Sequence, residues 1–353
     1  MRLLENLFIK GADVSWLKLM EDCGARYYEN GQLKDCLEIL KNNGINYIRL
    51  RIWNNPPFEY CNKQSTLEMV KRLKKLGFKF LLDFHYSDFW ADPAKQNKPA
   101  AWENLTFNEL KDAVYNYTKE VICALKDQGT LPDMVQIGNE ITWGMLWPDA
   151  KLSRENNGDE QWDKFTDLIK AGVNGVEDSL DSKQWIKIMI HIDRGGDNET
   201  SRWFFDNLIS KSVEFDVIGL SFYPLWHGTL SMLKDNISDL ALRYNKDIVV
   251  VECAYPFAIN TVEGSQSIIN DSSQLHEGYE ATPEGQARYV RDLIAIVKGI
   301  PQGRGKGVFY WEPDWIKVPN NKADKISINN WYNQALFDFE GNALKALQVF
   351  KEF

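Results

Sequence analysis

Short apolar runs alternate along this chain with segments that are apolar on one side only, and this alternation is its main structural signal. The runs are rich in Val, Ile, Leu and aromatic residues, a composition typical of strands. They predict strands at Phe8–Asp13, Tyr47–Trp53, Phe78–Tyr86, Met134–Glu140, Ile186–Asp193, Val217–Pro224, Ile248–Tyr255 and Val308–Pro313. Helical spacing of apolar residues predicts helices between them, among them Gln32–Asn42, Ser65–Leu76, Phe107–Lys126, Pro283–Lys298 and the last one, Ala343–Phe350.

The order of these elements indicates an α/β fold with a parallel sheet covered by helices, because each strand is mostly continuous in apolar residues. Right-handed crossovers then allow either a closed barrel or a doubly wound sheet. Eight strand–helix units favour the closed (β/α)8 TIM barrel, and no GxGxxG motif follows the first strand to support a dinucleotide-binding sheet. We therefore expect a single catalytic domain over residues 1–353.

The longest irregular stretches, which follow strands in each case, are residues 87–103, 143–158, 256–282 and 313–331. In a barrel, the loops after strands form the C-terminal face, where active sites are built. Polar and aromatic residues gather at the same strand ends: Arg49, Arg51, Asp83, His85, Asp88, Asn139, Glu140, His191, Tyr223, Glu252, Trp311 and Glu312. Singly, each has an ordinary structural explanation, such as an ion pair or, for Glu312, a surface charge. Together they predict a functional site.

Glu140 and Glu252 each follow an apolar strand directly, and a carboxylate is seldom buried unless something pairs with it. Two carboxylates facing one cavity suit glycoside hydrolysis, in which one protonates the leaving oxygen and the other attacks the sugar carbon. Arg49 is a natural partner to keep the nucleophile ionised, with Tyr223 and His85 as hydrogen-bond donors. Adjacent residues of a regular strand point to opposite faces. Asn139 and Glu140 can therefore both serve this site only if the backbone is irregular there.

Composition narrows the classes of ligand. The formal net charge of −9 argues against nucleic acid and against an anionic membrane surface, since both need basic patches. Thirteen Trp and fourteen Tyr exceed what a core requires, and such amphipathic rings suit a cleft for flat, polar ligands. No run approaches the roughly 20 apolar residues of a membrane-spanning helix.

The cysteines are odd in number and scattered, so the sequence predicts neither a disulfide framework nor a zinc site. The start, MRLLENLFIKGADVS, does not resemble a signal peptide. We expect a cytoplasmic protein, which free thiols favour, or the mature form of a secreted one.

Six long blocks stand out along the chain: GADVSWLKLMEDCGARYYENG, GINYIRLRIWNNP, LLDFHYSDFWADPAKQNKPAAW, VQIGNEITWGMLWP, ATPEGQARYVRDL and NQALFDFEGNAL. They resemble glycoside hydrolase family 53, the arabinogalactan endo-β-1,4-galactanases, which are retaining enzymes of clan A on a (β/α)8 barrel. The resemblance runs from about Gly11 to the C-terminus. It implies a galactan or galacto-oligosaccharide substrate, and we expect the protein to act as a monomer.

The clan pattern implies an acid/base at the end of the fourth strand, here Glu140, and a nucleophile at the end of the seventh, here Glu252. In retaining enzymes the two carboxyl groups lie about 5–5.5 Å apart. The resemblance assigns Asn139 to the sugar 2-hydroxyl and Trp311 to the platform under a sugar. It places Arg49, His85 and Tyr223 around the nucleophile. The full predicted substrate-binding set is Asn139, Arg49, His85, Asp83, Tyr223, Trp311, Trp90, Trp143, Trp147 and His191. Trp53 is a further subsite candidate with a core role as the alternative.

Some bacterial members bind calcium in the loop after the seventh strand, here Pro256–Thr282. The loop offers Asn260, Asn270, Asp271 and His276, short of the about six to eight oxygen ligands that calcium takes. No cofactor is therefore predicted. Two alternatives stay open: a clan A glycosidase for mannan, xylan or glucan, and a non-catalytic carbohydrate-binding barrel, against which the presence of both glutamates speaks.

Overall fold

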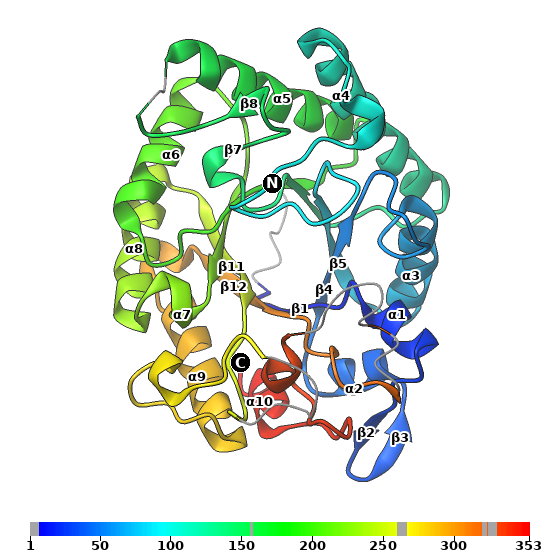
Figure 1. Ribbon diagram of the computed structural model, residues 1–353, viewed down its shortest axis with the longest axis vertical. Helices are drawn as coiled ribbons and strands as arrows, with labels where there is room; N and C mark the ends of the chain where they lie inside the picture. The colour runs from blue at the N-terminus through cyan, green and yellow to red at the C-terminus, as the bar shows by residue number, and fades with distance from the viewer. Residues whose placement is uncertain (1–6, 156–157, 260–266, 320–322, 324–329) are drawn as a thin grey trace. The chain divides into compact units, whose positions relative to one another are not determined.

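The computed structural model describes residues 7–155, 158–259, 267–319, 323 and 330–353. Eight parallel strands close into a barrel in the order β1, β12, β11, β10, β9, β6, β5, β4, and helices lie between strands along the chain (Figure 1). The strands are β1 (Ile9–Asp13), β4 (Tyr47–Ile52), β5 (Lys79–Phe84), β6 (Met134–Ile137), β9 (Lys187–Ile192), β10 (Val217–Phe222), β11 (Asp247–Cys253) and β12 (Gly305–Trp311). This confirms the TIM barrel predicted from the pattern of apolar runs.

The predicted strands are all present, and the differences lie at their ends. β6 ends at Ile137 rather than at Glu140, because Gly138 takes a φ of +81° and leaves the strand. β12 begins at Gly305 rather than at Val308. The glycines hid that start, yet Gly307 is needed there because an added Cβ would lie 2.2 Å from the Ile9 carbonyl oxygen of β1. Strand β1 therefore packs against β12 more closely than a side chain allows.

The helices begin where the sequence supplies capping groups. Thr106 and Glu109 form a capping box at the start of α4, and Thr282 caps α9, whose first residue is Pro283. The α-helices are α1 (Leu17–Asp22), α2 (Cys36–Asn42), α3 (Lys63–Lys75), α4 (Phe107–Asp127), α5 (Asp159–Glu177), α6 (Asn198–Ser210), α7 (Pro224–His227), α8 (Leu230–Tyr244), α9 (Pro283–Lys298) and α10 (Lys345–Gln348). The helices predicted at Ser65–Leu76, Phe107–Lys126 and Pro283–Lys298 are confirmed.

Two predicted helices need correction. The segment Gln32–Asn42 does not begin as a helix, since Gln32–Lys34 is β3 and pairs antiparallel with β2 (Tyr27–Glu29). The carboxylate of Asp35 accepts the backbone N–H groups of Leu37 and Glu38 and so fixes the start of α2 one residue later. At the C-terminus, the predicted helix divides into α10 and a 3-10 turn, η8 (Val349–Lys351).

The small hairpin of β7 (Gly144–Met145) and β8 (Ala150–Lys151) was not predicted from the sequence. It lies in the long irregular stretch after β6 that the sequence did predict. Strands of two residues carry no detectable alternation, so the hydrophobic pattern could not show them.

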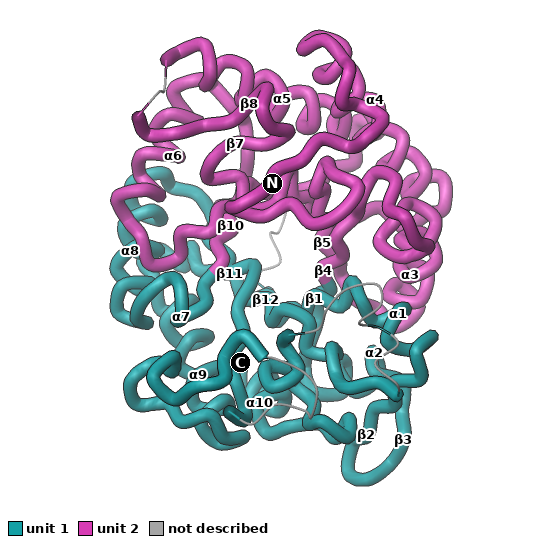
Figure 2. The backbone as a smooth tube through the Cα atoms, viewed as in Figure 1, with its two compact units in different colours: residues 1–48, 222–353 teal, residues 49–221 magenta. Residues whose placement is uncertain are grey.

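The chain divides into two compact units, residues 1–48 with 222–353 and residues 49–221 (Figure 2). Unit 1, the first of these, buries Trp16 and stacks Tyr255 on Tyr289 with ring centroids 4.2 Å apart. Unit 2 buries Trp53, Tyr86 and other large rings. The expectation of one catalytic domain over the whole chain stays a prediction.

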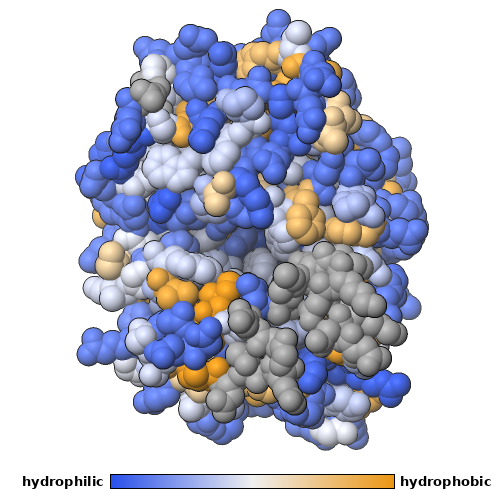
Figure 3. Space-filling view, in the orientation of Figure 1, coloured by the Kyte–Doolittle hydropathy of each residue, from blue (hydrophilic) through white to orange (hydrophobic). Residues whose placement is uncertain are grey.

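The face of the molecule in Figure 3 is mostly hydrophilic, with smaller apolar patches. Within the part of the chain that the structure describes, no helix combines the length and the apolar character that crossing a bilayer requires.

Candidate active site

Four polar side chains from three neighbouring strands of unit 2 form one buried network. Arg49 of β4 donates from Nη2 to Asp83 Oδ2 of β5 at 2.8 Å and to Asn139 Oδ1, just after β6, at 2.9 Å. Gln136 of β6 donates from Nε2 to Asp83 Oδ1 at 2.6 Å. All four side chains are almost fully buried, so these contacts replace the water that each polar group loses on folding.

His85 extends this network from the end of β5. Its Nε2 lies 3.0 Å from Asp83 Oδ2, and its Nδ1 accepts the backbone N–H of Ala91 at 3.2 Å. Since a backbone N–H can only donate, Nδ1 is unprotonated and Nε2 carries the hydrogen that Asp83 accepts. Asp83 thus orients both His85 and Arg49.

The backbone after β6 has the irregularity that Asn139 and Glu140 require to act in one site. Gly138 has a φ of +81° and Glu140 is left-handed, with φ 49° and ψ 48°. The turn is held from outside, because Gln96 Nε2 donates to the Asn139 carbonyl oxygen at 2.8 Å. A left-handed residue other than glycine is strained, and such strain concentrates at functional sites.

The side chain of Glu140 is half-buried and makes a short contact with β10. Ser221 Oγ lies 2.6 Å from Glu140 Oε1, and His191 Nε2 of β9 lies 2.8 Å from the same Ser221 Oγ. His191 and Ser221 are both fully buried. The sequence pointed to His191 as a substrate-binding residue but missed Ser221 and Gln136. The alternation of β10 offered a signal for Ser221, since it shares a face with Tyr223.

Glu252 is the penultimate residue of β11, in unit 1, and is 6% exposed. The hydroxyl of Tyr223 donates to Glu252 Oε2 at 2.9 Å. The neighbouring thiol of Cys253 donates to the Phe309 carbonyl oxygen, and burial raises its pKa far above the usual range. Cys253 is therefore protonated, and a thiol in that state is a poor nucleophile.

Aromatic rings of unit 1 line up beside Tyr223. Trp311, at the end of β12, has its ring centroid 4.6 Å from that of Trp331, and Trp331 lies 5.1 Å from Tyr223. Trp226 on α7 lies 5.6 Å from Tyr223 and is 54% exposed. An exposed indole that packs on Tyr223, whose hydroxyl contacts the buried Glu252, suits contact with a ligand. Trp226 and Trp331 were not among the predicted site residues.

The predicted aromatic subsites of unit 2 each carry a cation over the ring. Arg194 lies 5.3 Å from the ring centroid of Trp143, and Lys151 lies 4.4 Å from that of Trp147. Both indoles are half-buried. Their role as sugar-binding residues stays a prediction.

Trp90 and Trp53 share one cation, the guanidinium of Arg51, which lies 4.2 Å and 5.3 Å from their ring centroids. Trp53 is fully buried and packs against Phe58, Phe89 and Trp90, so the core alternative holds for it. Trp90 is half-buried, and its subsite role stays a prediction.

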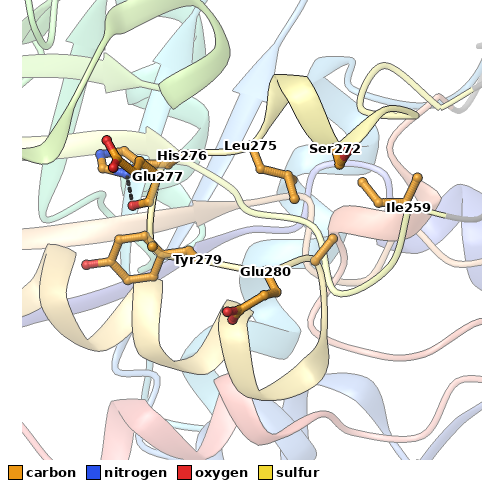
Figure 4. A pocket seen from close by; sticks show the side chains of 9 residues that line it. Ile259, Ser272, Leu275, His276, Glu277, Tyr279 and Glu280 are labelled. Atoms are coloured by element: carbon orange, nitrogen blue, oxygen red, sulfur yellow. Dashed lines mark hydrogen bonds between the residues drawn. The ribbon is translucent and has the colours of Figure 1, made fainter.

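The loop after β11 was the place where calcium was considered. His276 lines a surface pocket of about 440 Å³ there, together with Tyr279 and Glu280 (Figure 4). Both of its ring nitrogens have partners: Nδ1 lies 2.9 Å from the Glu277 carbonyl oxygen, and Nε2 accepts the Leu230 N–H at 2.9 Å. A metal would have to displace one of these contacts.

Asp271 and Asn270, the other candidates of this loop that the structure describes, have hydrogen-bond partners of their own. Asp271 accepts the backbone N–H of Ser273 as the cap of a 3-10 turn. Asn270 donates to the Ser267 carbonyl oxygen, and Asn260 lies outside the described residues. Across the described ranges, His, Cys, Asp and Glu side chains nowhere form a group of three placed to hold a metal ion.

Comparison with known proteins gives a family match over nearly the whole chain. The sequence model for glycosyl hydrolase family 53 matches residues 9–350. An endo-beta-1,4-galactanase of Bacillus subtilis (strain 168) is 35% identical over 98% of this chain and 85% of its own length. A Niallia circulans protein described as uncharacterized is 51% identical over 99% of this chain and 95% of its own. The solved GH53 catalytic domain of Ignisphaera aggregans superposes with a TM-score of 0.90 at 40% identity, covering 99% of this chain and 97% of that one.

Proposed function

Because this chain belongs to glycosyl hydrolase family 53, we propose that it cleaves β-1,4-galactosidic linkages of galactan, type I arabinogalactan or their oligosaccharides with retention of configuration. The observation that carries this assignment is the family match over residues 9–350. A polymer of neutral sugars also suits a chain with a net charge of −9, which disfavours polyanions.

We propose that Glu252 is the nucleophile and Glu140 the acid/base. In the first step, a carboxylate oxygen of Glu252 bonds to the anomeric carbon. The bond from that carbon to the leaving oxygen breaks, and Glu140 gives its proton to that oxygen. In the second step, Glu140 takes a proton from water, whose oxygen bonds to the anomeric carbon and releases Glu252.

The contacts of Glu252 support its role. The Tyr223 hydroxyl at 2.9 Å stabilises the carboxylate form and fixes Oε2, so that the other oxygen can attack. Burial of Glu252 removes the water that would otherwise shield its charge. The half-buried position of Glu140 and its contact with the Ser221 hydroxyl support the acid/base role.

The first experiment measures reducing-sugar release from unbranched β-1,4-galactan beside mannan, xylan and β-glucan. We expect wild-type protein to act on galactan and Glu252→Ala to lose that activity by at least about 10³-fold. Glu68→Ala, which removes an exposed carboxylate on α3, is the control and should keep wild-type activity. Preference for another polymer would overturn the substrate class and keep the mechanism.

A second measurement separates the two glutamates. With an activated aryl β-galactobioside, azide should rescue both alanine variants with opposite stereochemistry. Glu140→Ala should give the β-galactosyl azide, because azide then attacks the glycosyl-enzyme. Glu252→Ala should give the α-azide, because azide takes the place of the nucleophile. The reverse pattern would exchange the two roles.

The assignment of Glu252 and Glu140 also suggests roles for the residues around them. We propose that Asn139 contacts the sugar 2-hydroxyl and that Arg49, Asp83 and His85 hold it in place. Trp311 would stack under a sugar ring. Titration with galacto-oligosaccharides, followed by tryptophan fluorescence, would report that stacking, and Trp311→Ala should weaken it.

We further propose a monomer that needs no metal. Dialysis against EDTA should leave the rate on galactan unchanged, and the protein should elute as a monomer in size-exclusion chromatography.

The five cysteines are free thiols, which suits a reducing compartment and imported oligosaccharides as substrates. A rate on galactotetraose above that on the polymer would agree with this compartment, and the opposite ranking would favour a secreted enzyme.

A further inference from the structure

Ser221 and His191 are two buried side chains that form a hydrogen-bonded chain to the carboxylate of Glu140. Ser221 Oγ lies 2.6 Å from Glu140 Oε1 and 2.8 Å from His191 Nε2. Both Ser221 and His191 are fully buried, on the neighbouring strands β10 and β9. No step of the two-step mechanism given above uses the Ser221 hydroxyl.

The direction of these hydrogen bonds follows from the other side of the imidazole ring. The backbone N–H of Glu140 points at His191 Nδ1 at 3.4 Å, and Gln136 Nε2 lies 3.0 Å from the same atom. Asn139 Oδ1 also lies 3.0 Å from Nδ1, but it already accepts from the charged Nη2 of Arg49 at 2.9 Å. Because a backbone N–H can only donate, we assign Nδ1 as the acceptor and the hydrogen to Nε2.

This assignment fixes the Ser221 hydroxyl. His191 Nε2–H donates to Ser221 Oγ, so the single hydrogen of Ser221 points at Glu140 Oε1. A doubly protonated His191 would orient Ser221 in the same way. Oε1 is therefore an acceptor in both protonation states of Glu140. When Glu140 is protonated, its hydrogen resides on Oε2.

We propose that Ser221, oriented by His191, is a positioning residue that keeps the transferable proton of Glu140 on Oε2. The inference rests on the proposed role of Glu140 as acid/base. Protonation of the leaving oxygen and deprotonation of water are sensitive to which carboxyl oxygen carries the proton and where it points. The direct substrate contact predicted for His191 is replaced in this proposal by a role through Ser221.

The test compares Ser221→Ala on two substrates. The leaving group of galactan is a sugar hydroxyl, which needs a proton from an acid catalyst. The 2,4-dinitrophenolate of 2,4-dinitrophenyl β-galactobioside leaves without being protonated. We expect kcat/KM on galactan to fall by roughly 10- to 100-fold, part of the 10²–10⁴-fold that general acid–base catalysis supplies. On the aryl substrate kcat/KM should stay within about two-fold, because it reports only the first step. On the aryl substrate, kcat and KM should fall together. When Glu140 is a poorer base, hydrolysis of the glycosyl-enzyme is slower, so this intermediate accumulates.

Two further variants separate positioning from folding. Ser179→Ala removes another buried hydroxyl of unit 2, which donates to the Gly175 carbonyl oxygen at 2.6 Å. This variant should keep the wild-type kcat/KM on both substrates. Ser221→Thr keeps the hydroxyl and should recover most of the lost rate on galactan. The ratio of kcat/KM on the two substrates comes from one sample, so a partly unfolded preparation does not alter it.

An equal fall on both substrates, or no fall on either, would overturn the proposal. Wild-type protein that is inactive on galactan would instead reject the proposed function. If wild type cleaves galactan, Glu140→Ala does not, and Ser221→Ala matches wild type, then the function stands and only the role of Ser221 fails.

Discussion

The hydroxyl of Tyr223 donates a hydrogen bond to the carboxylate of Glu252, the proposed nucleophile. A donor at this oxygen does two things: it stabilises the charged form and it leaves the other oxygen oriented for attack. The same physics holds in unit 2, where a serine hydroxyl contacts Glu140. Each proposed catalytic carboxylate thus has one oxygen held by a hydroxyl from β10 or the residue that follows it.

Tyr223→Phe should lower kcat on galactan by about tenfold, equivalent to ~1.4 kcal/mol, which is the low end of what a hydrogen bond to a charged group contributes. The ring remains, so the melting temperature should change little. The matched control is Tyr115→Phe, which removes a hydroxyl bound to the Asp178 carboxylate at 2.9 Å on the exposed side of α4. Equal kcat values for the two variants would show that the Tyr223 contact has no part in catalysis.

At the scale of elements, the end of β6 decides how two consecutive residues serve one site. Gly138 leaves the strand with a φ of +81°, and the turn that follows carries Asn139 and Glu140. A Cβ at Gly138 would lie 2.7 Å from Ile141 Cγ2, so the position is limited both by conformation and by space.

Gly138→Ala should lower the free energy of unfolding by roughly 1–3 kcal/mol and should also lower activity, because the turn that holds Asn139 and Glu140 has to shift. Gly129→Ala is the control: its φ is +76°, but nothing lies within 4 Å of the added Cβ. That variant should lose about 1 kcal/mol and keep its rate on galactan. Urea unfolding and reducing-sugar release measure the two effects. Full activity of Gly138→Ala would mean that the turn tolerates a side chain.

The ends of elements also explain where the sequence-based boundaries were wrong. The sequence assigned Gln32–Lys34 to the helix that follows it, yet this segment pairs with β2, because strand pairing is a non-local choice. The early start of β12 was hidden by its glycines, whose purpose appears only when β1 lies beside them.

At the scale of the whole molecule, the buried acids at the end of β12 make stability depend on pH. Glu312 is 1% exposed, which excludes the alternative of a surface charge. Asp314 is fully buried, and neither of its carboxyl oxygens has a hydrogen-bond partner in the described part of the chain. Burial, followed by the charge of Glu312, raises the pKa of Asp314 well above its usual value.

A carboxyl whose pKa is raised on folding binds its proton more tightly in the folded state than in the unfolded chain. Its contribution to stability is present below the unfolded pKa of about 4 and is lost as pH rises through the folded pKa. Asp314→Asn mimics the protonated form, so its advantage over wild type in free energy of unfolding should grow with pH. Urea unfolding of both proteins at a series of pH values from about 4 upwards measures this difference in free energy of unfolding. Asp22→Asn, at an exposed ion pair on α1, should show a difference near zero at each pH.

The sequence by itself determined the barrel, because the alternation of apolar runs and amphipathic segments is a local property that helices and buried parallel strands impose on their own residues. It also identified the family, because the six blocks that carry the resemblance are each contiguous in the chain, and it pointed to Glu140 and Glu252, because each follows an apolar run directly. The helices with clear caps, such as α4 and α9, were predicted for the same local reason.

Only the tertiary structure decided which side chains form hydrogen bonds around the proposed catalytic residues. Ser221 and Gln136 look unremarkable within their own strands, and they matter because β9, β10 and β6 bring them to His191 and Glu140. The burial of Glu312, the exposed Trp226 beside Tyr223 and the irregular turn after Ile137 were decided in the same way. Burial and hydrogen-bond partners depend on residues far apart in the chain, and no local pattern records them.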